Sequence, residues 1–135
     1  NSRQRKQSLE YIYLFLHNAA VVSEDGVNFG PLTAYAGDDA EAARGILESF
    51  AEQSAANCRL LERALESGDV AALRAVAHKM LPIFTMLGAA GVAATLRTAE
   101  SWEGPLTDAL RGEIGAAAEN IRAIVAEAQK KVSLP

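Results

Sequence analysis

The chain has 135 residues, the size of a single domain, and half of them are hydrophobic, which is enough for one core. Its formal charge of −4 at pH 7 argues against nucleic-acid binding, which requires a basic patch. Because Cys58 is the only cysteine, no disulfide can form within the chain, and a reducing cytoplasm is the expected compartment. The apolar run over residues 11–16 is much shorter than the roughly 20 residues that cross a bilayer, so no direct membrane contact is expected.

The first predicted element is a helix over residues 3–20, whose apolar face consists of Leu9, Ile12, Tyr13 and Leu16. An isolated helix of this length is marginal in water, so we expect this face to cover one end or flank of the remaining structure. Residues 1–27 are therefore assigned to an N-terminal helix and linker, and residues 28–135 to the main helical domain.

A connector over residues 21–30 and a short helical turn over residues 31–36 are expected next, with Gly37 ending the turn. Asp38 then caps a long helix, because Glu41, three residues later, completes a pair of the capping-box type. The apolar stripe of this long helix is Ala43, Ile46, Leu47, Phe50, Leu61 and Leu65, with the small residues Ser54 and Cys58 between them.

Gly68 and Asp69 separate the long helix from the next one. Glycine readily adopts the left-handed conformation that ends a helix, and aspartate is a good N-cap. The helix that follows carries Leu73, Ala77, Met80, Phe84 and Leu87 on one face. It should end within residues 88–91, which begin and end with glycine.

Two further helices complete the predicted fold. The first runs to about Glu103 with Val92, Leu96 and Ala99 inward, and Gly104 and Pro105 then break the chain. The last helix runs from about Leu106 to Val132, with a stripe made of Leu110, Ile114, Ala117, Ile121, Ile124 or Val125, and Ala128. Short loops make neighbouring helices antiparallel, so the predicted fold class is all-α, an antiparallel up-down four-helix bundle with an additional N-terminal helix.

His78 is the candidate functional residue, because it falls on the side of its helix opposite the apolar stripe. An exposed imidazole is largely neutral near pH 7, and a neutral ring nitrogen is a nucleophile that needs no separate base. Arg74, Leu81, Pro82 and Thr85 share this side of the helix, and Lys79 lies on the opposite flank. Pro82 has no N–H for the carbonyl of His78, so a bend is expected at the level of the imidazole.

The segment AHKMLPIFTMLGA, residues 77–89, resembles the signature of histidine phosphotransfer (HPt) domains. That signature has an Ala-His pair, a basic residue, a small residue four positions after the histidine and a glycine ten positions after it. A second helix then runs to an acidic residue, here Glu100. The stretches AGDDAEAARGILESF and LESGDVAALRAVAHK resemble the family's approach to the histidine, and the resemblance covers residues 28–130. Two positions depart from the pattern: Leu81 stands where the family often has lysine, and Pro82 where it usually has glycine.

The resemblance implies that His78 is the phosphoacceptor and that Gly88 serves helix packing. Lys79 and Arg74 would support the phosphoryl charge, and Leu81, Pro82 and Thr85 would dock the partner. The implied partner is the receiver domain of a response regulator or hybrid kinase, which would itself bind the magnesium ion. No cofactor, metal or nucleotide site of its own is expected, so the chain would be a monomeric phosphotransfer carrier in two-component signalling and not an enzyme. Such domains often end a hybrid sensor kinase, so we expect an excised piece of a longer protein, and a membrane anchor could lie outside it.

Two other functions remain open at this point. The dimerisation and phosphoacceptor helices of a sensor kinase also place a proline shortly after a histidine. Their pattern has an acidic residue directly after the histidine and the proline five positions after it, whereas here Lys79 and Pro82 follow. The alternative is a helical adaptor bundle that is not phosphorylated, in which His78 has no role. A metal-binding or haem-binding bundle is disfavoured because Glu-x-x-His ligand pairs on facing helices are absent from the sequence.

Overall fold

The computed structural model describes residues 26–133, and this part of the chain contains helices and no β-strand. The helix predicted over residues 3–20 lies outside the described residues. The described elements are α2 (Gly30–Thr33), the 3₁₀ turn η2 (Ala34–Ala36), α3 (Ala40–Ser67), α4 (Val70–Met86), α5 (Ala90–Glu100) and α6 (Asp108–Ser133). The all-α prediction is confirmed for this part of the chain, as is the short helical turn before the long helix.

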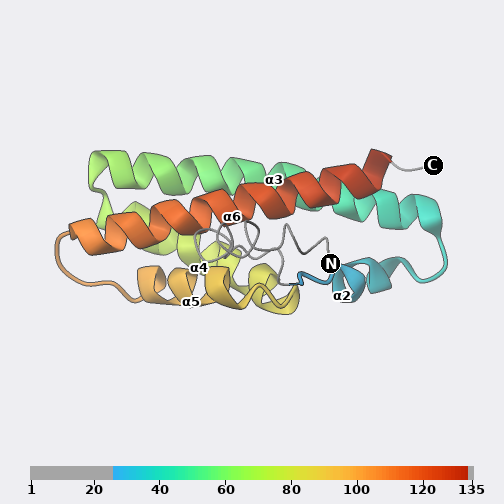
Figure 1. Cartoon of the computed structure of the whole chain (residues 1–135), viewed down its shortest axis with the longest axis horizontal. Helices are drawn as coiled ribbons and strands as arrows, with labels where there is room; N and C mark the ends of the chain where they lie inside the picture. The colour runs from blue at the N-terminus through green and yellow to red at the C-terminus, as the bar shows by residue number, and fades with distance from the viewer. Residues whose placement is uncertain (1–25, 134–135) are drawn as a thin grey trace, which may run out of the picture.

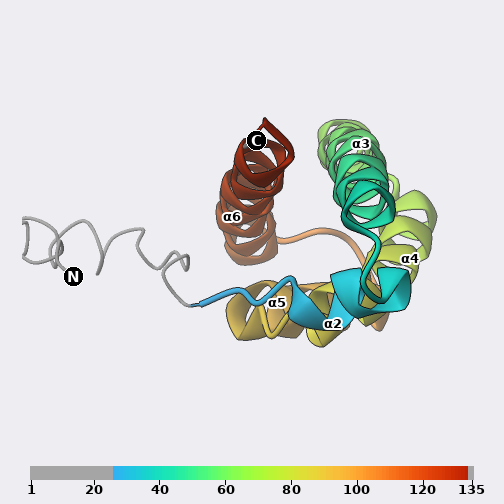
Figure 2. The same cartoon turned by 90° about the vertical axis from the view of Figure 1, so that its right-hand side faces the viewer.

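The helices from α3 to α6 pack around a shared interior, and consecutive helices run in opposite directions (Figure 1). α3 contacts α4 and α6, and α5 also contacts α4 and α6. Figure 2 looks along the helices and shows α6 and α4 on opposite sides of the interior. α2 lies near the start of α3, which it contacts. None of the described helices is both long and apolar enough to cross a membrane.

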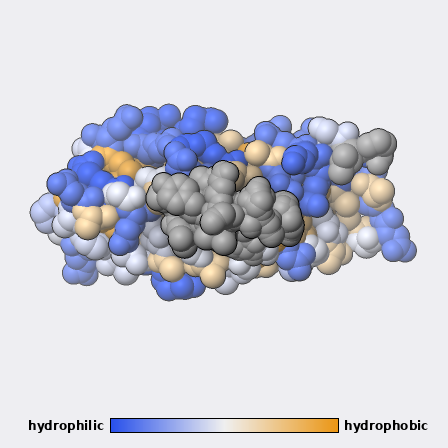
Figure 3. Space-filling model, viewed as in Figure 1, coloured by the Kyte–Doolittle hydropathy of each residue, from blue (hydrophilic) through white to orange (hydrophobic). Residues whose placement is uncertain are grey.

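Most residues of the predicted apolar stripes are buried in the core, although Ile46 and Leu65 are only partly buried and the core also includes Val76, which no stripe contained. Its largest fully buried side chains are Phe84, Leu61, Leu73, Met80, Leu87, Leu96, Ile114, Ile121 and Cys58. Three aromatic rings connect the first described residues to the helices, because Phe50 of α3 lies 5.8 Å from Phe29 and 5.7 Å from Phe84 between ring centroids. On the face drawn in Figure 3, hydrophilic residues predominate and hydrophobic ones form only small patches.

The junction between α3 and α4 is as predicted. Gly68 adopts the left-handed conformation with φ of +67°, and its N–H donates to carbonyls in the last turn of α3. The carboxylate of Asp69 accepts a hydrogen bond of 3.0 Å from the N–H of Ala72 in the first turn of α4. Both residues satisfy backbone groups that a helix end leaves unpaired, so the chain reverses within one short turn.

Two predicted helix starts are wrong by one or two residues. The N-cap of α3 is Asp39 and not Asp38: the Asp39 carboxylate accepts from the N–H groups of Glu41 and Ala42 at 3.1 Å and 3.0 Å. Gly37 ends the preceding turn with φ of +63°. One further residue, Asp38, lies between this glycine and the N-cap of α3, whereas the prediction placed none there. The last helix begins at Asp108 rather than Leu106, because the hydroxyl of Thr107 accepts a hydrogen bond from the N–H of Leu110 and caps the helix there.

α5 and the loop after it also differ slightly from the prediction. α5 ends at Glu100, earlier than the predicted end near Glu103. Pro105 lies in the loop before α6 and not in its first turn, and its carbonyl accepts a 3.1 Å hydrogen bond from the indole N–H of Trp102. Trp102 packs, partly buried, against the core and so fixes the loop that leads from α5 to α6.

Candidate functional site

His78 lies in the middle of α4, on the side of the helix that faces away from the core. Its side chain is 76% exposed, whereas its neighbours Ala77 and Met80 are buried. The alternation follows from the helical period, because residues three or four apart share a face and the apolar stripe turns inward. The predicted exposure of the imidazole is therefore present in the structure.

The imidazole is held by a carboxylate from the next helix. Nδ1 of His78 lies 2.7 Å from Oε2 of Glu100, the last residue of α5. A carboxylate only accepts hydrogen bonds, so Nδ1 carries the proton that is donated to Glu100. In a neutral ring the other nitrogen, Nε2, then has the free lone pair. This pairing selects the nitrogen that can act as a nucleophile.

A tight turn between α4 and α5 sets the register that brings His78 and Glu100 together. Gly88 has φ of +74°, a conformation that favours glycine, and the N–H of Ala89 donates to the carbonyl of Phe84 at 3.0 Å. A Cβ added at Gly88 would meet no heavy atom within 4 Å. The structure thus explains Gly88 by the positive φ at which the chain reverses. The resemblance implied a role in helix packing instead.

The other predicted site residues of α4 divide between two flanks. Arg74 and Thr85 are exposed, and Leu81 is partly buried against the core; all three lie on the same flank as His78. Pro82 is exposed on the outer surface within a helix that continues to Met86, and its missing N–H leaves the carbonyl of His78 without that donor. Lys79 is not part of this group, because it faces α3.

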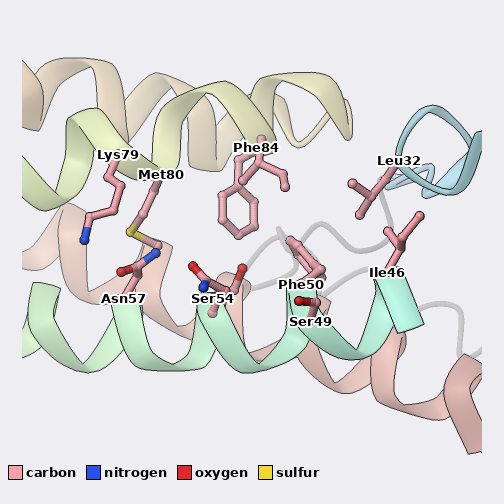
Figure 4. Close-up of a pocket in the computed structure, with 11 residues that line it drawn as sticks. Leu32, Ile46, Ser49, Phe50, Ser54, Asn57, Lys79, Met80 and Phe84 are labelled. Atoms are coloured by element: carbon pink, nitrogen blue, oxygen red, sulfur yellow. The ribbon is translucent and has the colours of Figure 1, made fainter. Parts of the chain in front are cut away.

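Lys79 lines a groove between α2, α3 and α4 that sequence reasoning did not predict. The groove has a volume of about 390 Å³, and its walls are formed mainly by Leu32, Ile46, Phe50, Met80, Ile83 and Phe84 (Figure 4). Figure 4 shows the ammonium group of Lys79 near Asn57 of α3. A second groove of about 370 Å³ between α3 and α4 is also lined by Lys79. Lys79, the residue after His78 in the sequence, therefore lies on the side of α4 that faces α3.

Glu100 contacts His78 in the structure, and sequence reasoning noticed this residue without assigning it a role. It was identified as the acidic end of the second helix, but its contact with His78 depends on how α4 and α5 are aligned. The antiparallel arrangement and the turn at Gly88 bring the two residues near each other, and the side-chain contact fixes the alignment. Sequence position alone does not reveal this, because His78 and Glu100 are 22 residues apart.

In a neutral imidazole whose Nδ1 donates to Glu100, Nε2 has the free lone pair. Within residues 26–133, no group of three or more histidine, cysteine, aspartate or glutamate side chains could hold a metal ion. No protein-family model matches the chain, and no curated protein or solved structure matches it either.

Proposed function

We propose that the chain is a histidine phosphotransfer domain, in which α3 to α6 form the antiparallel four-helix bundle and His78 carries the phosphoryl group. The observation that carries the proposal is the pairing of an exposed imidazole with Glu100, 2.7 Å from Nδ1, which leaves Nε2 available. The resemblance of residues 77–89 to the family signature supports the same reaction. The partner is a receiver domain that is phosphorylated on an aspartate.

The transfer needs no base from this chain. Nε2 of His78 attacks the phosphorus of the aspartyl phosphate in line; the N–P bond forms while the bond from phosphorus to the carboxylate oxygen breaks. The receiver regains its free aspartate. Nδ1 keeps its proton throughout, and the positive charge that develops on the ring is stabilised by the carboxylate of Glu100. The reverse step returns the phosphoryl group to an aspartate.

The other residues near His78 on α4 contact the receiver and supply positive charge. Leu81, Pro82 and Thr85 surround His78 on α4 and supply apolar and small contacts for the receiver. Arg74, one turn before the imidazole, contributes positive charge to its flank. Magnesium is held by the receiver, so this domain is a carrier without a kinase or nucleotide site. Its place is in the cytoplasm, within a longer hybrid sensor kinase.

The direct test uses a panel of purified receiver domains loaded with phosphate on their aspartate. The chain should acquire acid-labile phosphate, and His78→Gln should abolish this uptake. The melting temperature should barely change, because substitution of an exposed residue usually alters stability by less than about 0.5 kcal/mol. Uptake of acid-labile phosphate by His78→Gln would contradict the proposal. A wild-type chain that accepts phosphate from no receiver would favour the helical adaptor instead.

A further inference from the structure

The contact between His78 and Glu100 fixes which residues of α4 and α5 lie opposite each other. The two helices are antiparallel, so a step toward their connecting turn goes forward along α4 and backward along α5 (Figure 1). Three residues in that direction lead from His78 to Leu81 and from Glu100 to Arg97. Three residues span about 4.5 Å along a helix, and residues three apart lie on nearly the same face. Arg97 is therefore placed beside Leu81, one turn from the imidazole.

The guanidinium of Arg97 has no interaction partner within the described part of the chain. Its residue is exposed, and its side chain makes no hydrogen bond or ion pair with any of residues 26–133. By contrast, the side chain of Arg122 is paired with Glu62 at 2.6 Å, and that of Arg111 donates to the carbonyl of Leu65. Arg97 is thus a free cation next to the site.

The phosphorylated site needs a cation at this position. Once Nε2 carries a phosphoryl group, the carboxylate of Glu100 is a nearby like charge, which disfavours that group. Leu81, the α4 residue at this level, cannot compensate because it is apolar, and Lys79 faces α3. Arg74 is one turn away in the opposite direction, beyond the level at which α5 ends at Glu100.

We infer that Arg97 is the phosphoryl-binding residue of this domain and acts from α5 across the contact between the two helices. This inference rests on the proposed function. A guanidinium presents two parallel N–H donors to phosphoryl oxygens, and such charge-assisted hydrogen bonds are the strong ones. Arg97 and Glu100 thus have different roles. The carboxylate orients the imidazole, and the guanidinium compensates the charge of the transferred group.

The test compares the rate at which a phosphorylated receiver loads wild type, Arg97→Gln and a control variant, Arg59→Gln. Arg59 is an exposed arginine of α3, so the control removes the same charge from another helix. We expect Arg97→Gln to slow loading about tenfold or more, because the charge-assisted hydrogen bonds to the phosphoryl oxygens are lost. Arg59→Gln should behave as wild type. Phosphoramidate, a small donor that needs no docking surface, should show the same difference if Arg97 acts on the phosphoryl group.

Rescue distinguishes a phosphoryl-binding role from a structural one. Arg97→Lys should keep most of the rate, and Leu81→Lys should restore much of it in the Arg97→Gln chain, because residue 81 stands at the same level. Equal loading of wild type and Arg97→Gln would overturn the inference while leaving the proposed function intact. A deficit that neither lysine variant relieves would overturn it as well. If the wild type itself is never loaded, the proposed function fails and the inference fails with it.

Discussion

The two ring nitrogens of His78 differ because, within residues 26–133, Nδ1 has a side-chain partner and Nε2 has none. Glu100 accepts from Nδ1 at 2.7 Å, and this contact joins the last residue of α5 to the middle of α4. A hydrogen bond at one nitrogen sets the tautomer, and the tautomer decides which nitrogen can attack phosphorus. Glu100 is therefore a positioning residue in the proposed transfer.

Glu100→Ala should slow phosphorylation of His78 severalfold without abolishing it, because the nucleophile remains but its tautomer is no longer selected. The nitrogen chemical shifts of the imidazole should change from the form protonated at Nδ1 toward a mixture of tautomers. A structural role alone would not produce that change. Glu103→Ala is the matched control, since Glu103 is an exposed glutamate three residues later, outside α5. Unchanged imidazole shifts in Glu100→Ala would contradict the assignment.

Sequence reasoning predicted the exposure of His78, which the structure shows, and did not place Glu100 or Arg97. The exposure of His78 follows from local periodicity, because the stripe from Leu73 to Leu87 leaves the imidazole on the opposite face. The role of Glu100 depends on the alignment of two helices, which the stripes determine only as antiparallel. One contact between side chains settles that alignment, and Arg97 acquires a position only after it is known.

At the scale of the helices, the ends are determined by single side chains and by glycine conformations. Both Asp38 and Asp39 have the right chemistry for an N-cap, and only Asp38 has a glutamate three residues later. The turn through Gly37 decides between them, because it leaves Asp39 in the extended conformation of a cap, with ψ of 102°. The residue pattern could not identify the N-cap, because it contains no information on the backbone conformation of the preceding turn.

The cap assignment predicts different effects for these two neighbouring aspartates. Asp39→Ala should lower the free energy of unfolding by about 1 kcal/mol, the usual effect of removing an N-cap. Asp38→Ala should leave it nearly unchanged, because no cap bond depends on that side chain. Urea denaturation of both variants, followed by circular dichroism, measures the difference. A larger loss for Asp38→Ala than for Asp39→Ala would mean that α3 begins one residue earlier in solution.

At the scale of the whole molecule, the apolar stripes predicted most of the core but not all of it: Ile46 and Leu65 are only partly buried, and Val76 is buried although no stripe included it. Leu110, Ile114 and Ile121 of α6 are buried as predicted, and both Ile124 and Val125, offered as alternatives, are buried. The stripes could not identify the polar contacts that connect the helices across the molecule. Arg122 of α6 with Glu62 of α3, and Arg111 of α6 with the carbonyl of Leu65, are pairs of this kind.

Cys58 connects the packing of α3 and α6 to the pH dependence of stability. Its side chain is 2% exposed, and Sγ lies 3.7 Å from the carbonyl oxygen of Ala118. Burial raises the pKa of the Cys58 thiol above its ordinary value of 9.0, and the charge of Glu62 adds to the increase, although Arg122 opposes it. The folded protein therefore holds this proton more tightly than the unfolded chain does.

The sign of the effect on stability follows from proton binding. Well below pH 9.0 the thiol is protonated in both states, so its contribution to stability is fully present. As the pH rises above that value, the unfolded chain loses the proton first, and the contribution is lost as the pH passes through the pKa of the folded state. The free energy of unfolding should thus fall more steeply above pH 9.0 for wild type than for Cys58→Ala, although the variant is less stable at neutral pH because it loses a buried group. Urea titrations at a series of pH values measure the difference between the two chains, which removes the contributions of lysine and tyrosine common to both. Parallel curves above pH 9.0 would mean that the thiol ionises as readily in the folded protein as in the unfolded chain, and that α3 and α6 do not enclose it in solution.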